Sequence, residues 1–177
     1  MKLDSSKVAV VTGGASGLGE ATARGLASKG VKVGIFDMND ERGKAVASEI
    51  GGVFVKVNVA DNESVDQGFE AVRSVNGQER ILVNCAGIGG AEKTVSRNRE
   101  NGAIIPHDVD RYVRIININL IGSFLCASKS AAGMMTLEPI EPDGERGVVI
   151  NTASVAAQDG QIGQVAYSAS KGGILAM

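Results

Sequence analysis

Short runs of apolar residues, each closed by a glycine or a polar turn, recur along the chain. They occupy residues 7–12, 31–37, 53–59, 81–85 and 148–153. Runs of this length between turn residues are typical of strands that are buried on both faces of a parallel sheet. The pattern therefore predicts five parallel strands.

Segments with a helical pattern separate these runs. They cover residues 20–28, 40–50, about 61–75 and about 108–135. Asp61 and Asp108 precede two of them, and an aspartate at that position accepts the free N–H groups of a first helical turn. Alternating strands and helices require right-handed crossovers and helices on both faces of the sheet. We therefore expect an α/β fold with a doubly wound parallel sheet, in one domain that covers residues 1–177.

Two features depart from this alternation. Residues 88–107 form a long polar connection, and loops of that length are usually functional or disordered. His107 ends this loop, where a single histidine favours a surface position over a catalytic one. Asn117 and Asn119 interrupt the last long helix, and a polar side chain in an apolar helix needs a partner. Either one of these asparagines faces a site, or both are ordinary packing.

Composition narrows the functional classes. The chain has 177 residues, 44% of them apolar, which suits one domain with a real core. Its 18 basic and 20 acidic residues nearly balance, and aromatic residues make up 3%, so nothing indicates a nucleic-acid partner. The N-terminus has no signal-peptide pattern, and no apolar run approaches the length of a membrane span. Cys85 and Cys126 form no metal-like cluster, and as reduced thiols they predict a cytoplasmic protein without bound metal.

A glycine-rich loop follows the first strand and precedes a helix. In this context Gly13 permits a tight turn, Gly17 lets the backbone approach a pyrophosphate, and Gly19 lets the helix pack close to the strand. Free N–H groups at the helix start would bind the phosphates. The spacing is Gly-x-x-x-Gly-x-Gly, not the commoner Gly-x-Gly-x-x-Gly, and a turn that merely needs glycine is the alternative. The order strand, loop, helix favours a nucleotide site.

Asp37 lies at the end of the second strand, about 20 residues past the glycine loop, where an acidic residue binds a ribose 2′-hydroxyl. A carboxylate there would repel a 2′-phosphate, so we expect NAD in preference to NADP. The alternative is a helix cap, a role that Asn39 or Asp40 could fill equally well.

Ser154, Tyr167 and Lys171 follow the fifth strand. Residues four apart share one face of a helix, so Lys171 can hold its ammonium close to the Tyr167 phenol. A free tyrosine, with a pKa of about 10, is a poor base, but a nearby positive charge favours the phenolate. Such a tyrosine can be a general base on an alcohol or a general acid on a ketone. Taken alone, the pair is more typical of an amphipathic helix face.

Several of these residues converge on one place in the predicted sheet. The glycine loop, Asp37, Gly87 and Ser154 all follow the carboxyl ends of strands, where sheets of this kind bind ligands. This convergence predicts a single site.

Together these residues resemble the short-chain dehydrogenase/reductase family over nearly the whole chain. The segment Thr12-Gly13-x-x-x-Gly17-x-Gly19 resembles its cofactor motif, and Asn84-Cys85-Ala86-Gly87 resembles its Asn-Asn-Ala-Gly motif. The catalytic tetrad of that family is matched by Asn119, Ser154, Tyr167 and Lys171. The resemblance implies a Rossmann fold and NAD-linked hydride transfer.

Within the family, residues 84–88, 151–157 and 160–167 look most like the type II 3-hydroxyacyl-CoA dehydrogenases, also described as 17β-hydroxysteroid dehydrogenase type 10. That likeness implies a homotetramer of fatty acid metabolism that oxidises an acyl-CoA thioester, from 3-hydroxyacyl-CoA to 3-ketoacyl-CoA. Tyr167 would be the base, with Ser154 on the substrate oxygen, Lys171 on the nicotinamide ribose and Asn119 holding a water in the proton path.

The likeness also implies contact residues. Ser154, Gln164 and Tyr167 would bind substrate. The implied cofactor-binding residues are Gly13, Ser16, Gly17, Leu18, Gly19, Asp37, Asn58, Val59, Cys85, Ala86, Gly87, Tyr167 and Lys171. Asn58 stands where many members have an aspartate against the adenine, and an asparagine can still accept from the adenine amino group.

Members of the family continue past the position of Met177 with two more strands, a substrate loop and part of the subunit interface. We therefore expect the C-terminal part of the fold to be missing from this sequence, and with it the residues that set acyl chain length. A hydroxysteroid, another alcohol or a 3-oxoacyl carrier-protein thioester is an alternative substrate. A non-catalytic nucleotide-binding scaffold subunit is the alternative from another class, against which the intact tetrad speaks.

Overall fold

The computed structural model describes residues 1–177, and the chain divides into two compact units. The first, which we call the sheet unit, consists of Met1–Ala86 and Ser123–Thr152. The second, the helical unit, consists of Gly87–Gly122 and Ala153–Met177. Each unit is described by itself.

Five parallel strands form the sheet in the order β3-β2-β1-β4-β7. They are β1 (Val8–Thr12), β2 (Lys32–Asp37), β3 (Val53–Lys56), β4 (Ile81–Asn84) and β7 (Val148–Asn151). Each predicted apolar run contains one of these strands, which confirms the predicted α/β fold with a parallel sheet. The strands β3, β4 and β7 end earlier than their runs do.

Helices connect the strands, and two of them begin at side-chain caps. They are α1 (Gly17–Ala27), α2 (Asp40–Ile50), α3 (Asn62–Asn76) and α5 (Gly122–Met134). The carboxylate of Asp61 accepts the N–H of Ser64, which confirms the predicted cap of α3. The cap of α2 is Asn39, whose side-chain oxygen accepts the N–H of Arg42.

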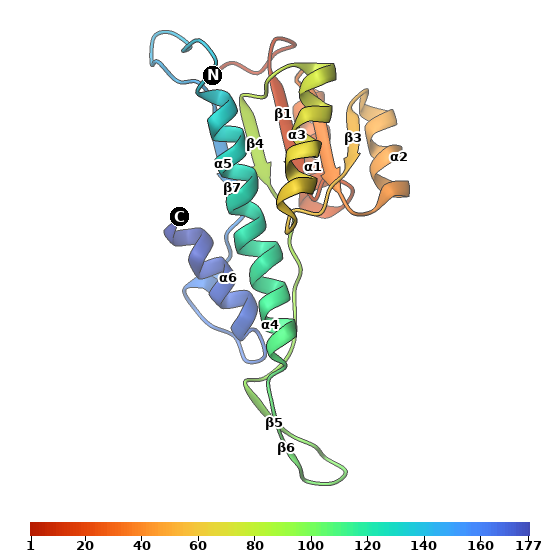
Figure 1. Cartoon of the computed structure of the whole chain (residues 1–177), viewed down its shortest axis with the longest axis vertical. Helices are drawn as coiled ribbons and strands as arrows, with labels where there is room; N and C mark the ends of the chain where they lie inside the picture. Colours follow the sequence, from red (N-terminus) through yellow and green to blue (C-terminus); the bar gives the residue numbers. More distant parts are fainter. The chain divides into compact units, whose positions relative to one another are not determined.

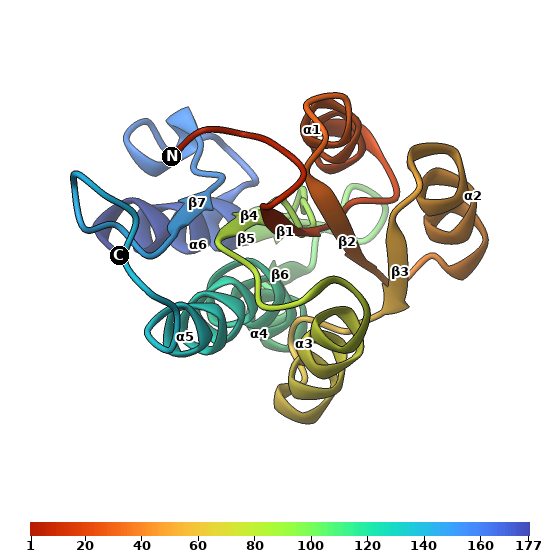
Figure 2. The same cartoon turned by 90° about the horizontal axis from the view of Figure 1, so that it is seen from above.

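Successive side chains of β2 point to opposite faces of the sheet, and both faces are covered. Ile35 joins an apolar cluster with Ala23 of α1 and Val46 of α2. Its neighbour Phe36 contacts Phe69 of α3 edge to face, with ring centroids 5.1 Å apart. Figure 2 shows α1 on one side of the strands and α3 on the other. Burial on both faces explains why the strands read as continuous apolar runs.

The two cysteines lie in the sheet unit and are free thiols. Cys126 of α5 is fully buried, and this burial raises the pKa of its thiol to about 12. Cys85 follows β4 and is half-buried, and its sulfur accepts the hydroxyl of Thr152 at 3.6 Å.

The helical unit consists of two α-helices, two short helical turns of other types and a hairpin. These elements are β5 (Val95–Arg97), β6 (Ile104–Pro106), α4 (Val109–Ile116), the π-helical turn η1 (Asn117–Ile121), the 3₁₀ turn η2 (Val155–Ala157) and α6 (Val165–Ala176). The helix α6 packs against α4, η1 and η2. Asp108 caps α4 as predicted, because its carboxylate accepts the N–H groups of Asp110 and Arg111.

The hairpin corrects the prediction of an irregular loop over residues 88–107. Strands β5 and β6 pair antiparallel with Val95 opposite Pro106, and Figure 1 shows them as the hairpin that precedes α4. All six of their residues are exposed. Strands of three exposed residues leave no buried apolar run, so the hydrophobic pattern could not indicate them.

The segments α4, η1 and α5 form one continuous helix of 26 residues, Val109–Met134. By length and composition it could cross a membrane, which corrects the expectation that no segment approaches such a length. The two asparagines made the segment look interrupted, although its average is apolar. This likeness is weak evidence for a span, since the core helix of a soluble protein meets the same criteria.

Candidate functional site

The loop between β1 and α1 leaves the first turn of α1 open to an anion. Ser16 is the N-cap of α1, and its side chain makes no capping hydrogen bond. Ser16, Gly17 and Leu18 are exposed. Because the first N–H groups of a helix have no partner within the helix, they can bind a phosphate here.

Two glycines of this loop occupy positions where a side chain would not fit. Gly13 has φ +66°, and a Cβ on it would lie 2.8 Å from the Cα of Ala86. A Cβ on Gly19 would lie 2.1 Å from the carbonyl oxygen of Gly13. Gly17 faces open space, with φ +54°. The loop thus has a tight turn, a close helix-to-strand approach and an open backbone, which are the features that pyrophosphate binding requires.

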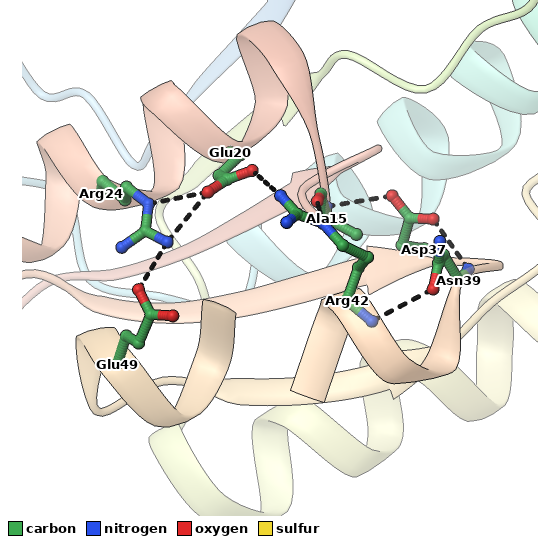
Figure 3. A network of polar contacts seen from close by, with 7 residues as sticks. All are labelled: Ala15, Glu20, Arg24, Asp37, Asn39, Arg42 and Glu49. Carbon is green, nitrogen blue, oxygen red and sulfur yellow. Dashed lines mark hydrogen bonds and ion pairs between the residues drawn. The ribbon is translucent and has the colours of Figure 1, made fainter. Parts of the chain in front are cut away.

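The carboxylate of Asp37 is held at the end of β2 by two backbone groups. Its Oδ2 accepts the N–H of Ala15 at 3.0 Å, and its Oδ1 accepts the N–H of Asn39 at 2.9 Å (Figure 3). Each oxygen keeps a lone pair that can accept a ribose hydroxyl. The helix-cap alternative for Asp37 is wrong, because Asn39 caps α2.

A buried polar cluster joins the carboxyl ends of β1, β4 and β7. The Oγ1 of Thr12 accepts the N–H groups of Cys85 and Ala86 at 3.2 and 3.1 Å. The side-chain amide of Asn84 donates to Asn151 Oδ1 at 2.9 Å and to the Ser123 carbonyl at 3.1 Å. This cluster fixes the backbone that carries Cys85 and Ala86. The signal in the sequence was a threonine or asparagine at the end of an apolar run.

Two further predicted cofactor contacts follow β3. Asn58 is exposed, and its Oδ1 accepts the N–H of Ala60 at 3.1 Å. Its own N–H donates to the Ser64 hydroxyl at 3.0 Å. Val59 is buried. The side-chain oxygen of Asn58 therefore stabilises its own turn, whereas the side-chain nitrogen Nδ2 makes no hydrogen bond there.

In the helical unit, Asn119 is fully buried and bridges three groups. Its Nδ2 donates to the carbonyl of Ile88 at 3.0 Å and to the Ser170 hydroxyl at 3.1 Å. Its Oδ1 accepts the N–H of Ile88 at 2.8 Å. Asn117 is exposed, so Asn119 is the one of the two whose buried side chain needs partners. Asn119 lies within the π turn η1, and such turns are frequent at functional sites.

The pair on α6 has the expected common face. The Nζ of Lys171 lies 5.8 Å from the centroid of the Tyr167 ring. Lys171 is buried, with 7% of its surface exposed, while Tyr167 is half-buried. The hydroxyl of Ser170 donates to the carbonyl of Tyr167 at 2.7 Å and accepts from Asn119, which ties α6 to η1.

Ser154, Gln164 and Gly87 lie in the same unit. The Oγ of Ser154 accepts the N–H of Ala156 at 3.2 Å, which leaves its hydroxyl hydrogen as a donor. Gln164 is the N-cap of α6 and is half-buried. A Cβ on Gly87 would lie 3.2 Å from Asn119 Oδ1. The helix α6, which carries Tyr167 and Lys171, packs on η1, which contains Asn119, and on η2, which Ser154 caps.

His107 is more buried than the expected surface histidine, with 12% of its side chain exposed. Its Nδ1 lies 3.4 Å from the Lys93 carbonyl, and its ring meets that of Tyr112 edge to face. Its Nε2 lies 3.9 Å from a carboxylate oxygen of Glu92. These contacts hold the base of the β5–β6 hairpin and give His107 a structural role.

Each unit therefore gathers one kind of chemistry. The sheet unit holds an open phosphate-binding loop and a positioned acid at the end of β2. The helical unit holds a phenol beside a buried ammonium, and a serine hydroxyl on a neighbouring element. A phenol next to a cation can transfer a proton to or from an oxygen of a substrate.

Comparisons with known proteins identify the family of this chain. The family model described as short chain dehydrogenase matches residues 7–177. Over 172 residues, the chain is 45% identical to 3-hydroxyacyl-CoA dehydrogenase type-2 of Drosophila melanogaster and 42% identical to the human protein of that name. These matches cover 96% of this chain, and 66% and 64% of the two relatives.

A solved structure is also similar. The crystal structure of 3-hydroxyacyl-CoA dehydrogenase type-2 from Mycobacterium avium matches with a TM-score of 0.89 at 39% identity. The match covers 99% of this chain and 68% of that one. The chain thus spans slightly less than two thirds of the length of the curated relatives that it matches.

Proposed function

Because the chain belongs to the short chain dehydrogenase family, we propose that it is an NAD-dependent oxidoreductase that oxidises 3-hydroxyacyl-CoA to 3-ketoacyl-CoA. The observation that carries this proposal is the pair on α6, where the buried Lys171 ammonium lies 5.8 Å from the centre of the Tyr167 ring. Relatives that are 42–45% identical bear the name of this activity, which supports the substrate class.

In the proposed reaction Tyr167 is the general base. Its phenol oxygen, as phenolate, takes the proton from the substrate hydroxyl, and the buried Lys171 ammonium lies beside the same ring. Ser154 donates its hydroxyl hydrogen to the same substrate oxygen as that oxygen becomes a carbonyl. NAD, when bound, supplies the acceptor for the hydride that leaves the carbon. The protein contributes orientation, charge and the movement of the proton.

The cofactor would be held by residues whose geometry fits it. The open first turn of α1 suits a pyrophosphate, and the carboxylate of Asp37 suits a ribose 2′-hydroxyl. A second negative charge on that ribose would meet the Asp37 carboxylate, which supports NAD over NADP. Cys85, Ala86 and Gly87 offer the backbone that follows β4.

Asn119 fits best as a positioning residue. Both N–H groups of its amide are used by the Ile88 carbonyl and the Ser170 hydroxyl. Since Ser170 also bonds the Tyr167 carbonyl, Asn119 fixes the helix that carries the base. A water in the proton path would then be held by remaining acceptors of this turn, and not by the amide nitrogen.

The test is a matched pair of tyrosine variants, because the chain has two tyrosines. Tyr167→Phe should lower kcat on 3-hydroxybutyryl-CoA by roughly 10³-fold, measured at a concentration at which NAD still binds. Tyr112→Phe, on α4, should stay within about twofold of wild type. Near-wild-type turnover in Tyr167→Phe would show that the base is misassigned.

A panel of substrates separates the proposed activity from its rivals. We would compare a 3-hydroxyacyl-CoA, a hydroxysteroid and a 3-oxoacyl carrier-protein thioester, each with NAD and with NADP. The proposal predicts the highest kcat/KM for the 3-hydroxyacyl-CoA with NAD. Tight NAD binding without turnover of any of these compounds would favour the scaffold function instead.

The proposal also includes a homotetramer, which the resemblance to the family implies, and a cytoplasmic location, which the two reduced cysteines predict. Sedimentation equilibrium of the whole protein tests the assembly, and a mass four times that of one protomer is the expected result. Cell fractionation with an antibody against the chain tests the location.

A further inference from the structure

A network of charged side chains surrounds the end of β2. Arg42, in the first turn of α2, donates from Nη2 to Oε2 of Glu20 in α1 at 2.6 Å. The other oxygen of Glu20 accepts from Arg24 at 2.9 and 3.0 Å, and Arg24 also pairs with Glu49 at 2.7 Å. Figure 3 shows this chain of contacts reaching Ala15 in the glycine loop, which in turn contacts Asp37 at the end of β2.

Asp37 and Arg42 bind the two backbone groups of one residue, Ala15. Ala15 donates its N–H to the Asp37 carboxylate at 3.0 Å, and its carbonyl accepts from Arg42 Nε at 3.3 Å. The cation of Arg42 therefore lies one residue's width from the acid that would bind the ribose 2′-hydroxyl. A phosphate on that hydroxyl would come within reach of a guanidinium, which is the side-chain group best suited to bind it.

We propose that Glu20 is a specificity-determining residue, which pairs with Arg42 and thereby keeps its guanidinium from binding a 2′-phosphate. Preference for NAD then depends on two carboxylates. Asp37 repels a 2′-phosphate, and Glu20 holds the guanidinium of Arg42 that could otherwise bind it. This inference rests on the proposed function, because it requires the dinucleotide to bind at this loop.

The geometry shows which partner is fixed and which can move. Only 19% of the Glu20 side chain is exposed, and Arg24 holds it from the other side. The hydrogen bonds from Arg24 also lower the pKa of Glu20, so its carboxylate stays charged at neutral pH. The Arg42 side chain is 56% exposed. If the charge of Glu20 were removed, the guanidinium could turn toward an incoming anion at small cost.

The experiment measures binding of NAD and NADP to the purified chain by titration calorimetry. Glu20→Gln should tighten NADP relative to NAD by about tenfold, the size of one charge-assisted contact to phosphate. Glu49→Gln is the matched control, since it removes a carboxylate of the same network and leaves the Arg42–Glu20 bond in place. Its ratio should stay within about twofold of wild type. Adding Arg42→Met to Glu20→Gln should return the ratio to the wild-type value.

A second variant keeps the proposal falsifiable if Glu20→Gln does not fold, which thermal unfolding would reveal. Arg42→Met in the wild-type background should leave the NADP to NAD ratio unchanged, because Arg42 is already held by Glu20. A loss of NADP affinity of fivefold or more in this variant would overturn the proposal.

The remaining outcomes separate this inference from the proposed function. Tight NAD binding by the wild type, with an unchanged ratio in a folded Glu20→Gln, overturns the role of Glu20 alone. Binding of neither NAD nor NADP by the wild type overturns the proposed function, and the role of Glu20 with it.

Discussion

The sheet unit and the helical unit are built by different means. In the sheet unit, β1 and β4 are wholly buried, and the core is mostly aliphatic. In the helical unit few apolar side chains are buried, and buried polar residues stand beside them. The buried residues of the helical unit, besides Gly122, are Ile115, Asn119, Ala156, Ala166, Ser170, Lys171 and Ile174. The sheet unit is stabilised mainly by the packing of buried apolar side chains. The helical unit relies more on individual hydrogen bonds between buried polar groups.

The difference matters because the two kinds of contact respond differently to change. Apolar packing has no direction, and swaps that conserve volume usually cost little. A buried hydrogen-bond network depends on each member, since losing one atom leaves its partners unsatisfied. The core of the sheet unit should therefore tolerate swaps between apolar side chains of similar volume. The helical unit should not tolerate the loss of a buried hydrogen-bonding group.

The largest expected effect comes from removing volume at the centre of the sheet unit. Phe36→Ala deletes a fully buried ring that contacts Phe69, and should destabilise the chain by about 4 kcal/mol in urea unfolding. Phe124→Ala, at a position that is 52% exposed, is the control and should cost less than about 1 kcal/mol. Equal costs for the two variants would contradict an apolar core organised around β2.

Asn119→Ala should have the next largest effect, and it should be local to the helical unit. It removes both partners of the Ile88 peptide and a donor to Ser170, and should cost about 2–3 kcal/mol. Hydrogen exchange at the Ile88 N–H and along α6 should speed up, while exchange in β1 and β4 should not. Asn117→Ala, at an exposed position two residues away, should leave both exchange and stability unchanged.

A smaller effect tests the polar cluster at the edge of the sheet unit. Thr12→Val keeps the shape of the side chain but leaves the N–H of Ala86 without its acceptor, and should cost about 1–2 kcal/mol. Thr12→Ser keeps the acceptor oxygen and should cost less. If valine were as stable as threonine here, the cluster would not fix the backbone after β4.

The smallest expected effect is on how stability depends on pH, through the carboxylate of Glu20. The hydrogen bonds from Arg24, and next the charge of Arg42, lower the pKa of Glu20 below its ordinary 4.5. The stability from this shift is present above about pH 4.5 and is lost as the pH falls through the lower folded pKa. Below pH 4.5, the midpoint temperature of thermal unfolding should therefore decrease less steeply with falling pH in Glu20→Gln than in wild type. Identical slopes would show that the network adds no stability.

The sheet unit was largely predictable from the sequence. Strands β1 and β4 are buried along their whole length and β2 along most of it, so each appears as an apolar run. Asp61 caps α3 and so indicates where that helix begins. The loop with Gly13 and Gly19 was predictable because a strand and a helix flank it. The network of Glu20 and Arg42 was not, since a contact between residues 22 apart depends on how α1 and α2 pack.

The helical unit was less predictable, for physical reasons. The π turn at Asn117–Ile121 leaves no mark in hydrophobic periodicity, and the partners of Asn119 lie far from it in sequence. Tyr167 and Lys171 were found because a spacing of four places two side chains on one face of any helix. The exposed hairpin of β5 and β6 was missed, since nothing buried defines its strands.

The buried thiol of Cys126 can report how often the sheet unit opens around it. With a pKa near 12, about one such thiol in ten thousand is ionised at pH 8, and the folded chain shields its sulfur completely. Alkylation of Cys126 must therefore wait until the layer around α5 opens. The rate at which a mild alkylating reagent labels this position counts those openings directly in the native chain. No probe has to be engineered, and the half-buried Cys85 provides an internal standard for reagent access.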